Sequence, residues 1–218
     1  MTRDQMLQWL NEYWDVLRSM DADRWVDLYT DEPAGLLLAD RRFAIQERWA
    51  RRTLEAADGR IDVLWLGEDL GTQRSPMISM DVFRRHFRPR YQRLVDLGKE
   101  FGCRVMIHTC GCSSWAYDEF IDMGIDAVDT LQPEAVDMAP AYLKRRFGGR
   151  LAFHGCISTA GPVAFGSVDE VVADCRKTLQ IMMPGGGYCF APTHELQDNS
   201  PTENVLAMYR AARELGRY

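Results

Sequence analysis

The chain has 218 residues with a formal net charge of −6, and 46% of its residues are hydrophobic. This length allows a single domain with a substantial core, and the lack of a long basic run argues against a nucleic-acid partner. The charged N-terminus is unlike a signal peptide and no apolar run of about 18 residues occurs, so we expect a cytoplasmic protein without a membrane partner. The six cysteines are better explained as thiols or metal ligands than as a disulfide framework.

Helix signals dominate the first 57 residues, which contain no clear catalytic motif. Thr2 and Gln5 have the spacing of a helix-capping box, and apolar residues recur after them at helical intervals. We predict one domain, 1–218, in which a helical N-terminal segment over 1–57 precedes βα units over 58–218.

From residue 58 on, short apolar runs alternate with amphipathic segments of helix length. This alternation is typical of βα units that form a parallel sheet. The expected strands are 61–69, 104–108, 125–131, 150–156 and 187–191. Helices are expected to begin at Ser79, Ser167 and Ser200, with a kink at Pro89 in the first and Cys175 in the core face of the second.

Polar side chains gather where the expected strands end. The carboxyl ends of parallel strands meet at one edge of a sheet, so these side chains should converge there. They are Glu68, Asp69, Gln73, His108, Cys110, Gln132, Glu134, His154, Cys156, Cys189 and His194.

The segment RVMIHTCGCSSW, residues 104–115, carries the strongest chemical signal. Residues two apart on a strand point the same way, so His108, Cys110 and by extension Cys112 would project together at the strand end. An imidazole and a thiolate side by side are zinc ligands. Buried cysteines can also act simply as small apolar residues, and the residues alone leave both interpretations open.

Five segments, taken in order, resemble the uroporphyrinogen decarboxylase (URO-D) superfamily, and they are closest in motif to its zinc-dependent corrinoid methyltransferases. They are GEDLGTQRSPMIS (67–79), HTCGC (108–112), GIDAVDTLQP (124–133), GGGYCFAPTHELQ (185–197) and SPTENVLAMYRAARELG (200–216). The resemblance implies a TIM-type (β/α) barrel with its active site at the mouth formed by the strand ends. A full barrel needs about eight strands and 250 residues, so the expected strands predict an incomplete α/β barrel.

The resemblance also implies a set of metal ligands. His108 and Cys110 match the zinc-binding His-x-Cys pair of the methyltransferases, and the third ligand is either Cys189 or His194. A second His-x-Cys pair, His154 and Cys156, stands where relatives more often have glycines.

Four residues are expected to line the substrate pocket by the same resemblance. Asp69 would have a catalytic and substrate-binding role, or would instead orient a ligand or cap the next helix. Gln73, His194 and Gln197 would contact substrate, so His194 is ambiguous between metal and substrate.

The implied activity is a zinc-dependent methyltransferase that moves a methyl group between a corrinoid carried by a partner protein and a thiol or similar small-molecule acceptor. The first alternative is uroporphyrinogen decarboxylase, a metal-free enzyme of porphyrin biosynthesis, although neither its arginine-rich motif nor its catalytic aspartate is found. The second is a truncated or split barrel chain. In either case the open sheet would call for a homo-oligomer or a complementing chain.

Overall fold

The computed structural model describes residues 33–217, together with Asp4, Gln8 and Asn11. The chain divides into two compact units, of which the first contains residues 33–61 and 78–101 and the second contains 62–77 and 102–217. The capping box expected at Thr2 and Gln5 lies outside the described residues.

The first unit is helical. Its elements are α3 (Pro33–Ala57), α4 (Met80–Val82), the π-helix η1 (Phe83–Phe87) and α5 (Arg88–Glu100). Helix α3 packs against α5, where the rings of Phe43 and Tyr91 meet edge to face at 5.3 Å and Arg51 makes two 2.9 Å bonds to Glu100. The expected interruption at Pro89 falls one turn earlier, as the π-helix, and Pro89 sits in the first turn of α5, where a missing N–H costs nothing.

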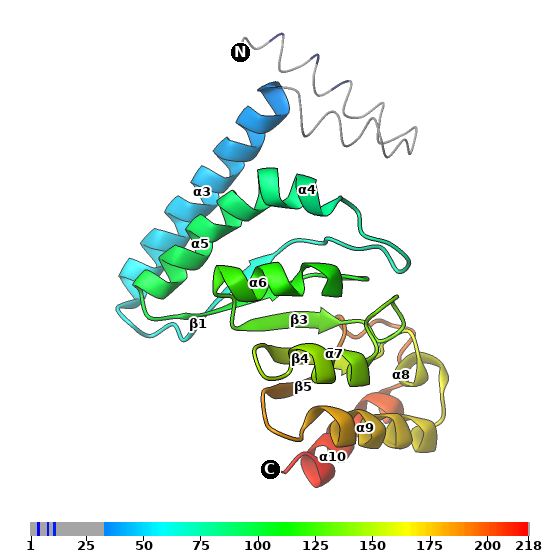
Figure 1. The fold of residues 1–218 in the computed structure, drawn as a ribbon. Helices are drawn as coiled ribbons and strands as arrows, with labels where there is room; N and C mark the ends of the chain where they lie inside the picture. The colour runs from blue at the N-terminus through cyan, green and yellow to red at the C-terminus, as the bar shows by residue number, and fades with distance from the viewer. Residues whose placement is uncertain (1–3, 5–7, 9–10, 12–32, 218) are drawn as a thin grey trace. The chain divides into compact units, whose positions relative to one another are not determined.

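The second unit is built on a parallel sheet (Figure 1). Its strands are β1 (Val63–Gly67), β2 (Arg104–His108), β3 (Ala127–Leu131), β4 (Ala152–Ile157) and β5 (Tyr188–Pro192), which pair in that order. Within residues 33–217, no strand pairs with the outer edge of β1 or of β5. The sheet is therefore an incomplete α/β barrel, as predicted.

Helices of the second unit lie between its strands from β2 on and after β5. They are η2 (Ser114–Ala116), α6 (Tyr117–Met123), α7 (Pro140–Phe147), α8 (Pro162–Phe165), α9 (Val168–Met182) and α10 (Thr202–Leu215). The predicted capping box at Ser167 and Glu170 opens α9. Helix α9 packs against α10 (Figure 1). Cys175 lies in this contact and is fully buried, as expected. None of the described helices has the length and apolarity to cross a membrane.

The two faces of the sheet differ in burial. Val105, Ile107, Val128 and Phe153 alternate along their strands on the face that is packed into the core. The opposite face holds Trp65, which is 60% exposed. Side chains on this second face are free to form a binding surface.

Two glycines let the loops after β1 and β2 pack directly on each other. Gly111 has φ +68°, and a Cβ there would lie 2.5 Å from the carbonyl oxygen of Thr72. A Cβ on Gly71 would lie 2.5 Å from the carbonyl oxygen of Cys112, whose N–H donates to the Thr72 oxygen at 2.8 Å. This contact sets the position of the loop that carries Cys110.

We predict that Gly111→Ala lowers the free energy of unfolding by more than about 2 kcal/mol. The new side chain would have to adopt a left-handed backbone and would also overlap the neighbouring loop, and the two costs add. Gly185→Ala is the matched control: its φ is +79°, but a Cβ there meets nothing within 4 Å. It should cost only about 1–2 kcal/mol. Urea unfolding of both variants measures the difference, and equal losses would show that the loop contact is not tight.

Candidate functional site

The parallel register sets five residues in one row across the sheet. Gly67 pairs with His108, His108 with Asp129, Asp129 with His154, and His154 with Cys189. Neighbouring strands lie about 4.8 Å apart, so adjacent members of the row can touch and distant members cannot. The row is the base of the candidate site.

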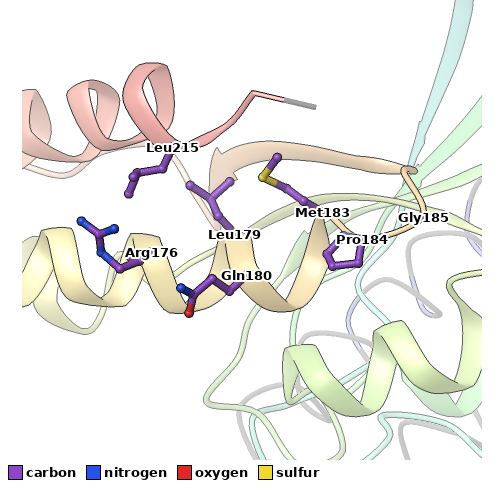
Figure 2. Close-up of a pocket in the computed structure, with 7 residues that line it drawn as sticks. All are labelled: Arg176, Leu179, Gln180, Met183, Pro184, Gly185 and Leu215. Atoms are coloured by element: carbon purple, nitrogen blue, oxygen red, sulfur yellow. The ribbon is translucent and has the colours of Figure 1, made fainter.

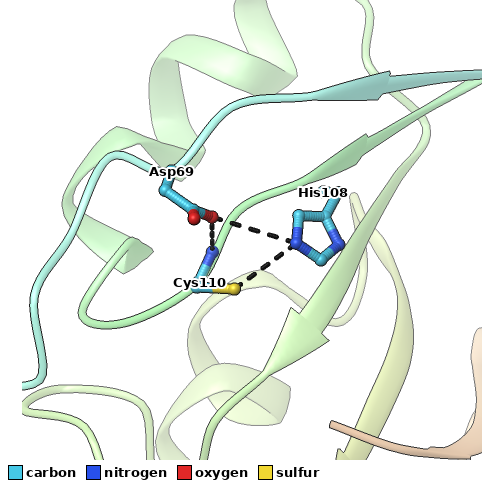
Figure 3. A group of neighbouring side chains, drawn as sticks. All are labelled: Asp69, His108 and Cys110. Atoms are coloured by element: carbon cyan, nitrogen blue, oxygen red, sulfur yellow. Dashed lines mark hydrogen bonds and ion pairs between the residues drawn. The ribbon is translucent and has the colours of Figure 1, made fainter. Parts of the chain in front are cut away.

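Three potential metal ligands meet at one end of this row. Asp69, His108 and Cys110 each offer a donor atom, and these atoms lie within 4.8 Å of one another (Figure 3). His108 Nε2 is 3.4 Å from Cys110 Sγ and 3.8 Å from Asp69 Oδ1. Donors bound to one zinc ion at about 2.0–2.3 Å in a tetrahedron are separated by about 3.3–3.8 Å, so the set fits zinc.

Asp69 is tied to this place by the loop contact described above. The N–H of Cys110 donates to Asp69 Oδ1 at 2.9 Å, and the N–H of Leu70 donates to Thr109 Oγ1 at 3.2 Å. The loops after β1 and β2 are thereby fastened together, which brings Asp69 beside the His-x-Cys pair.

His108 is oriented by groups behind it. Its Nδ1 lies 2.9 Å from Asp129 Oδ2 and 2.7 Å from Thr130 Oγ1. The Asp129 hydrogen bond raises the pKa of His108 against the opposing effect of burial. With Nδ1 held in this way, Nε2 faces the thiol and the carboxylate of the cluster.

Cys110 is a neutral thiol in the metal-free protein. Burial is the main cause that raises its pKa to about 12, and the Asp69 carboxylate adds to the effect. Metal binding must therefore displace the thiol proton, which makes metal affinity increase with pH.

His194 approaches the cluster from the loop after β5. Its Nδ1 lies 3.9 Å from Cys110 Sγ and its Nε2 lies 2.8 Å from Gln132 Nε2. Gln132 Oε1 already accepts from the N–H of Gly111 at 2.6 Å and from Gln73 Nε2 at 2.9 Å, so the Gln132 amide nitrogen donates to His194. Since Nε2 accepts this hydrogen bond, we infer that neutral His194 carries its ring hydrogen on Nδ1, which faces the Cys110 sulfur.

The remaining cysteines that the sequence placed at strand ends lie elsewhere. Cys189 stands three strands from His108 in the row, about 14 Å away at the backbone. Cys112 is buried, because the positive φ of Gly111 turns the chain back into the core, against the expectation that it projects with His108. Cys156 is also buried, and burial raises its pKa to about 12.

A cavity of about 970 Å³ opens over the row. Its walls include Trp65, His108, Asp129 and His154, and the loop 191–198 after β5, which contains Gln197, completes them. The rings of Trp65 and His108 meet edge to face at 6.0 Å. Gln73, which was expected to contact substrate, is not part of this wall, and its Nε2 donates to Gln132 Oε1 at 2.9 Å.

Sequence reasoning missed Asp129 and gave Gln132 no role. Asp129 is the second acidic residue of IDAVDTL, and a charge inside an apolar strand is a signal, because a buried carboxylate needs partners. Trp65 carried no comparable signal, since an aromatic residue in an apolar run is ordinary core composition.

A second cavity, of about 470 Å³, lies at the ends of α9 and α10, away from these groups (Figure 2). Leu179, Met183 and Leu215 form much of its wall. Of its lining residues in the described chain, Arg176 alone is charged. It offers no combination of acid, base or metal ligand.

Comparison with known proteins gives two findings. The family model described as uroporphyrinogen decarboxylase (URO-D) matches residues 68–215. Among solved structures, the chain is similar to a methyltransferase from Methanosarcina mazei, with a TM-score of 0.59 and 18% sequence identity, over 100% of this chain and 55% of that chain. The chain thus spans about half the length of that protein, and the likeness concerns the fold. A comparison with curated proteins gives no match.

We predict that iodoacetamide modifies exposed Cys189 long before Cys110 in the metal-free protein at about pH 8, because a thiol with a pKa of about 12 is almost entirely protonated. The Cys110 rate should rise about tenfold per pH unit below that pKa. Asp69→Asn should accelerate it by removing a nearby negative charge. Mass spectrometry of the labelled peptides gives the rates, and comparable rates at pH 8 would contradict a raised pKa.

Proposed function

Because the chain belongs to the uroporphyrinogen decarboxylase family, we propose that it is a zinc-dependent methyltransferase whose metal is held by His108 and Cys110. The observation that carries the proposal is the spacing of Asp69, His108 and Cys110, which suits one zinc ion. Asp69 is the third ligand that the distances favour. His194, one of the two third ligands that the family resemblance implies, is the alternative, and Cys189, the other, lies about 14 Å away from His108 at the backbone.

Zinc with three protein ligands keeps a fourth position for substrate, where a bound thiol is deprotonated at neutral pH. In this proposal, residues of the chain surround the fourth position and orient the substrate that enters it. His194 reaches the Cys110 sulfur from the cavity side, and Trp65 gives the same cavity an aromatic wall. In this proposal the methyl group passes between a corrinoid on a partner protein and a thiol-type acceptor in the cavity.

The charge of the cavity favours this activity over tetrapyrrole decarboxylation. A porphyrinogen substrate carries several carboxylates, which proteins bind with Arg and Lys side chains. The residues that line the cavity in the described chain include Asp129, Glu195 and Asp198 but neither Arg nor Lys. Decarboxylation would also leave the Asp69, His108 and Cys110 cluster without a role.

The open sheet supports a further part of the proposal, which is that the chain works with added strands from a second copy or a complementing chain. The unpaired edges of β1 and β5 expose backbone hydrogen-bonding groups, and Val63 and Trp65 on the edge strand β1 are 43% and 60% exposed.

We predict that the purified chain binds one equivalent of zinc. Cys110→Ser should remove most of it, because a hydroxyl is a far poorer ligand than a thiolate. Loss of a true ligand should cost more than the 10–100-fold that is typical of an orienting partner, so Asp69→Asn and His194→Gln identify the third ligand. Cys189→Ser is the matched control and should leave affinity unchanged.

Competition with a chromophoric chelator measures these affinities. In the cobalt-substituted protein, added 2-mercaptoethanol should change the visible spectrum if a position is open. Wild-type protein that holds well under one equivalent of supplied zinc would refute the proposed function.

We also predict that the chain alone is not a monomer of 25.0 kDa with a cooperative melt. Light scattering after size exclusion should show a larger assembly, since unpaired edges and exposed aromatic surface associate. A monodisperse monomer with a sharp transition would remove the need for added strands.

A further inference from the structure

Unusual backbone geometry surrounds Asp129. Thr130, a β-branched residue, has φ +61°, and the pairing of β3 with β4 shifts register between Asp129 and Leu131. On the facing strand Gly155 has φ +118° and Cys156 has φ +70°. At the two positions that are not glycine, Thr130 and Cys156, such conformations are strained, and strain of this kind gathers where a structure holds side chains in set positions.

The Asp129 carboxylate joins two imidazoles. Asp129 is 5% exposed, and its Oδ2 lies 2.9 Å from His108 Nδ1 while its Oδ1 lies 2.5 Å from His154 Nδ1. The side chain of an aspartate is ordinarily ionised at neutral pH, since its unperturbed pKa is about 3.9. An ionised carboxylate only accepts hydrogen bonds, so both rings must carry a hydrogen on Nδ1.

We propose that Asp129 is the positioning residue of this site, and that it turns His108 and His154 so that each neutral ring presents Nε2 to the cavity. His108 offers Nε2 to the metal, and His154 offers Nε2 to a substrate group that donates a hydrogen bond, such as a thiol or hydroxyl. The metal and substrate roles rest on the proposed function, whereas the tautomers do not.

The His108 and His154 rings differ in the groups that lie near their Nε2 atoms. His108 Nε2 faces Cys110 and Asp69, as a ligand would. His154 lines the same cavity, and no group of the described residues bonds its Nε2. A buried ion cluster that served stability alone would have no need to leave this nitrogen directed at a cavity.

Nitrogen NMR of the metal-free protein tests the tautomers directly. The chain has four histidines, so a spectrum with ¹⁵N-labelled histidine can be assigned by single His→Gln variants. At about pH 9, above the ordinary histidine pKa of about 6.5, we expect His108 and His154 to carry the hydrogen on Nδ1. A neutral ring of either histidine that carries its hydrogen on Nε2 in the wild-type protein overturns the proposal, whether or not zinc binds.

Asp129→Asn tests positioning. An amide has one accepting oxygen and one donating nitrogen and cannot accept from both rings, so at least one ring should lose its Nδ1–H tautomer, and zinc affinity should fall 10–100-fold. Asp126→Asn is the control: Asp126 accepts from the N–H of Val105 at 2.7 Å at the other end of β3, and its loss should leave tautomers and zinc affinity unchanged. Unchanged tautomers in folded Asp129→Asn overturn the positioning role.

His154→Gln tests the substrate role with 2-mercaptoethanol as the probe on cobalt-substituted protein. Cobalt affinity should stay within about threefold of wild type, since His154 is not a ligand, while the thiol concentration needed for the spectral change should rise about tenfold or more. Equal thiol affinity in variant and wild type overturns the substrate role. A loss of cobalt affinity comparable to that of Cys110→Ser overturns it too, because His154 would then be a ligand.

Discussion

The parallel register of the five strands is the constraint on which the site depends. It sets Gly67, His108, Asp129, His154 and Cys189 in one row, and the strand spacing then decides which of them meet. Asp129 can bind both histidines because it stands between them. A shift of β3 by one residue against both β2 and β4 would turn Asp129 to the other face of the sheet and break both bonds at once.

The register also explains why a buried charge is tolerated in β3. A carboxylate with 5% exposure would be strongly destabilising without partners, whereas two imidazole N–H groups satisfy both of its oxygens. The backbone of the next residue, Thr130, is strained in a left-handed conformation, and the Thr130 hydroxyl lies within hydrogen-bond distance of His108 Nδ1. The hydrogen bonds of Asp129 and the strained backbone at Thr130 therefore act on the same imidazoles, and a substitution at either residue should change the orientation of those rings.

Sequence reasoning located the strands and the incomplete barrel because their signals are local: apolar runs, capping serines and loop residues at the strand ends. It could place His108 and Cys110 together for the same reason. It could not foresee that Gly111 buries Cys112, since that turn depends on contact with Gly71 and Thr72. Nor could it find the bridge at Asp129, because that follows from register between strands more than 20 residues apart in the chain.

The candidate metal ligands are brought together without closure of the barrel. All the donor groups of the cluster, and both groups that orient His108, belong to the second compact unit. Their positions follow from the β1–β4 register and from the hydrogen bonds between the loops after β1 and β2. The added strands of the proposal would therefore change the far wall of the cavity and the access of substrate, while the three candidate ligands already lie within 4.8 Å of one another. The proposed methyl transfer would need both, because the ligands would hold the metal while the enclosing wall would exclude water from the reacting thiolate.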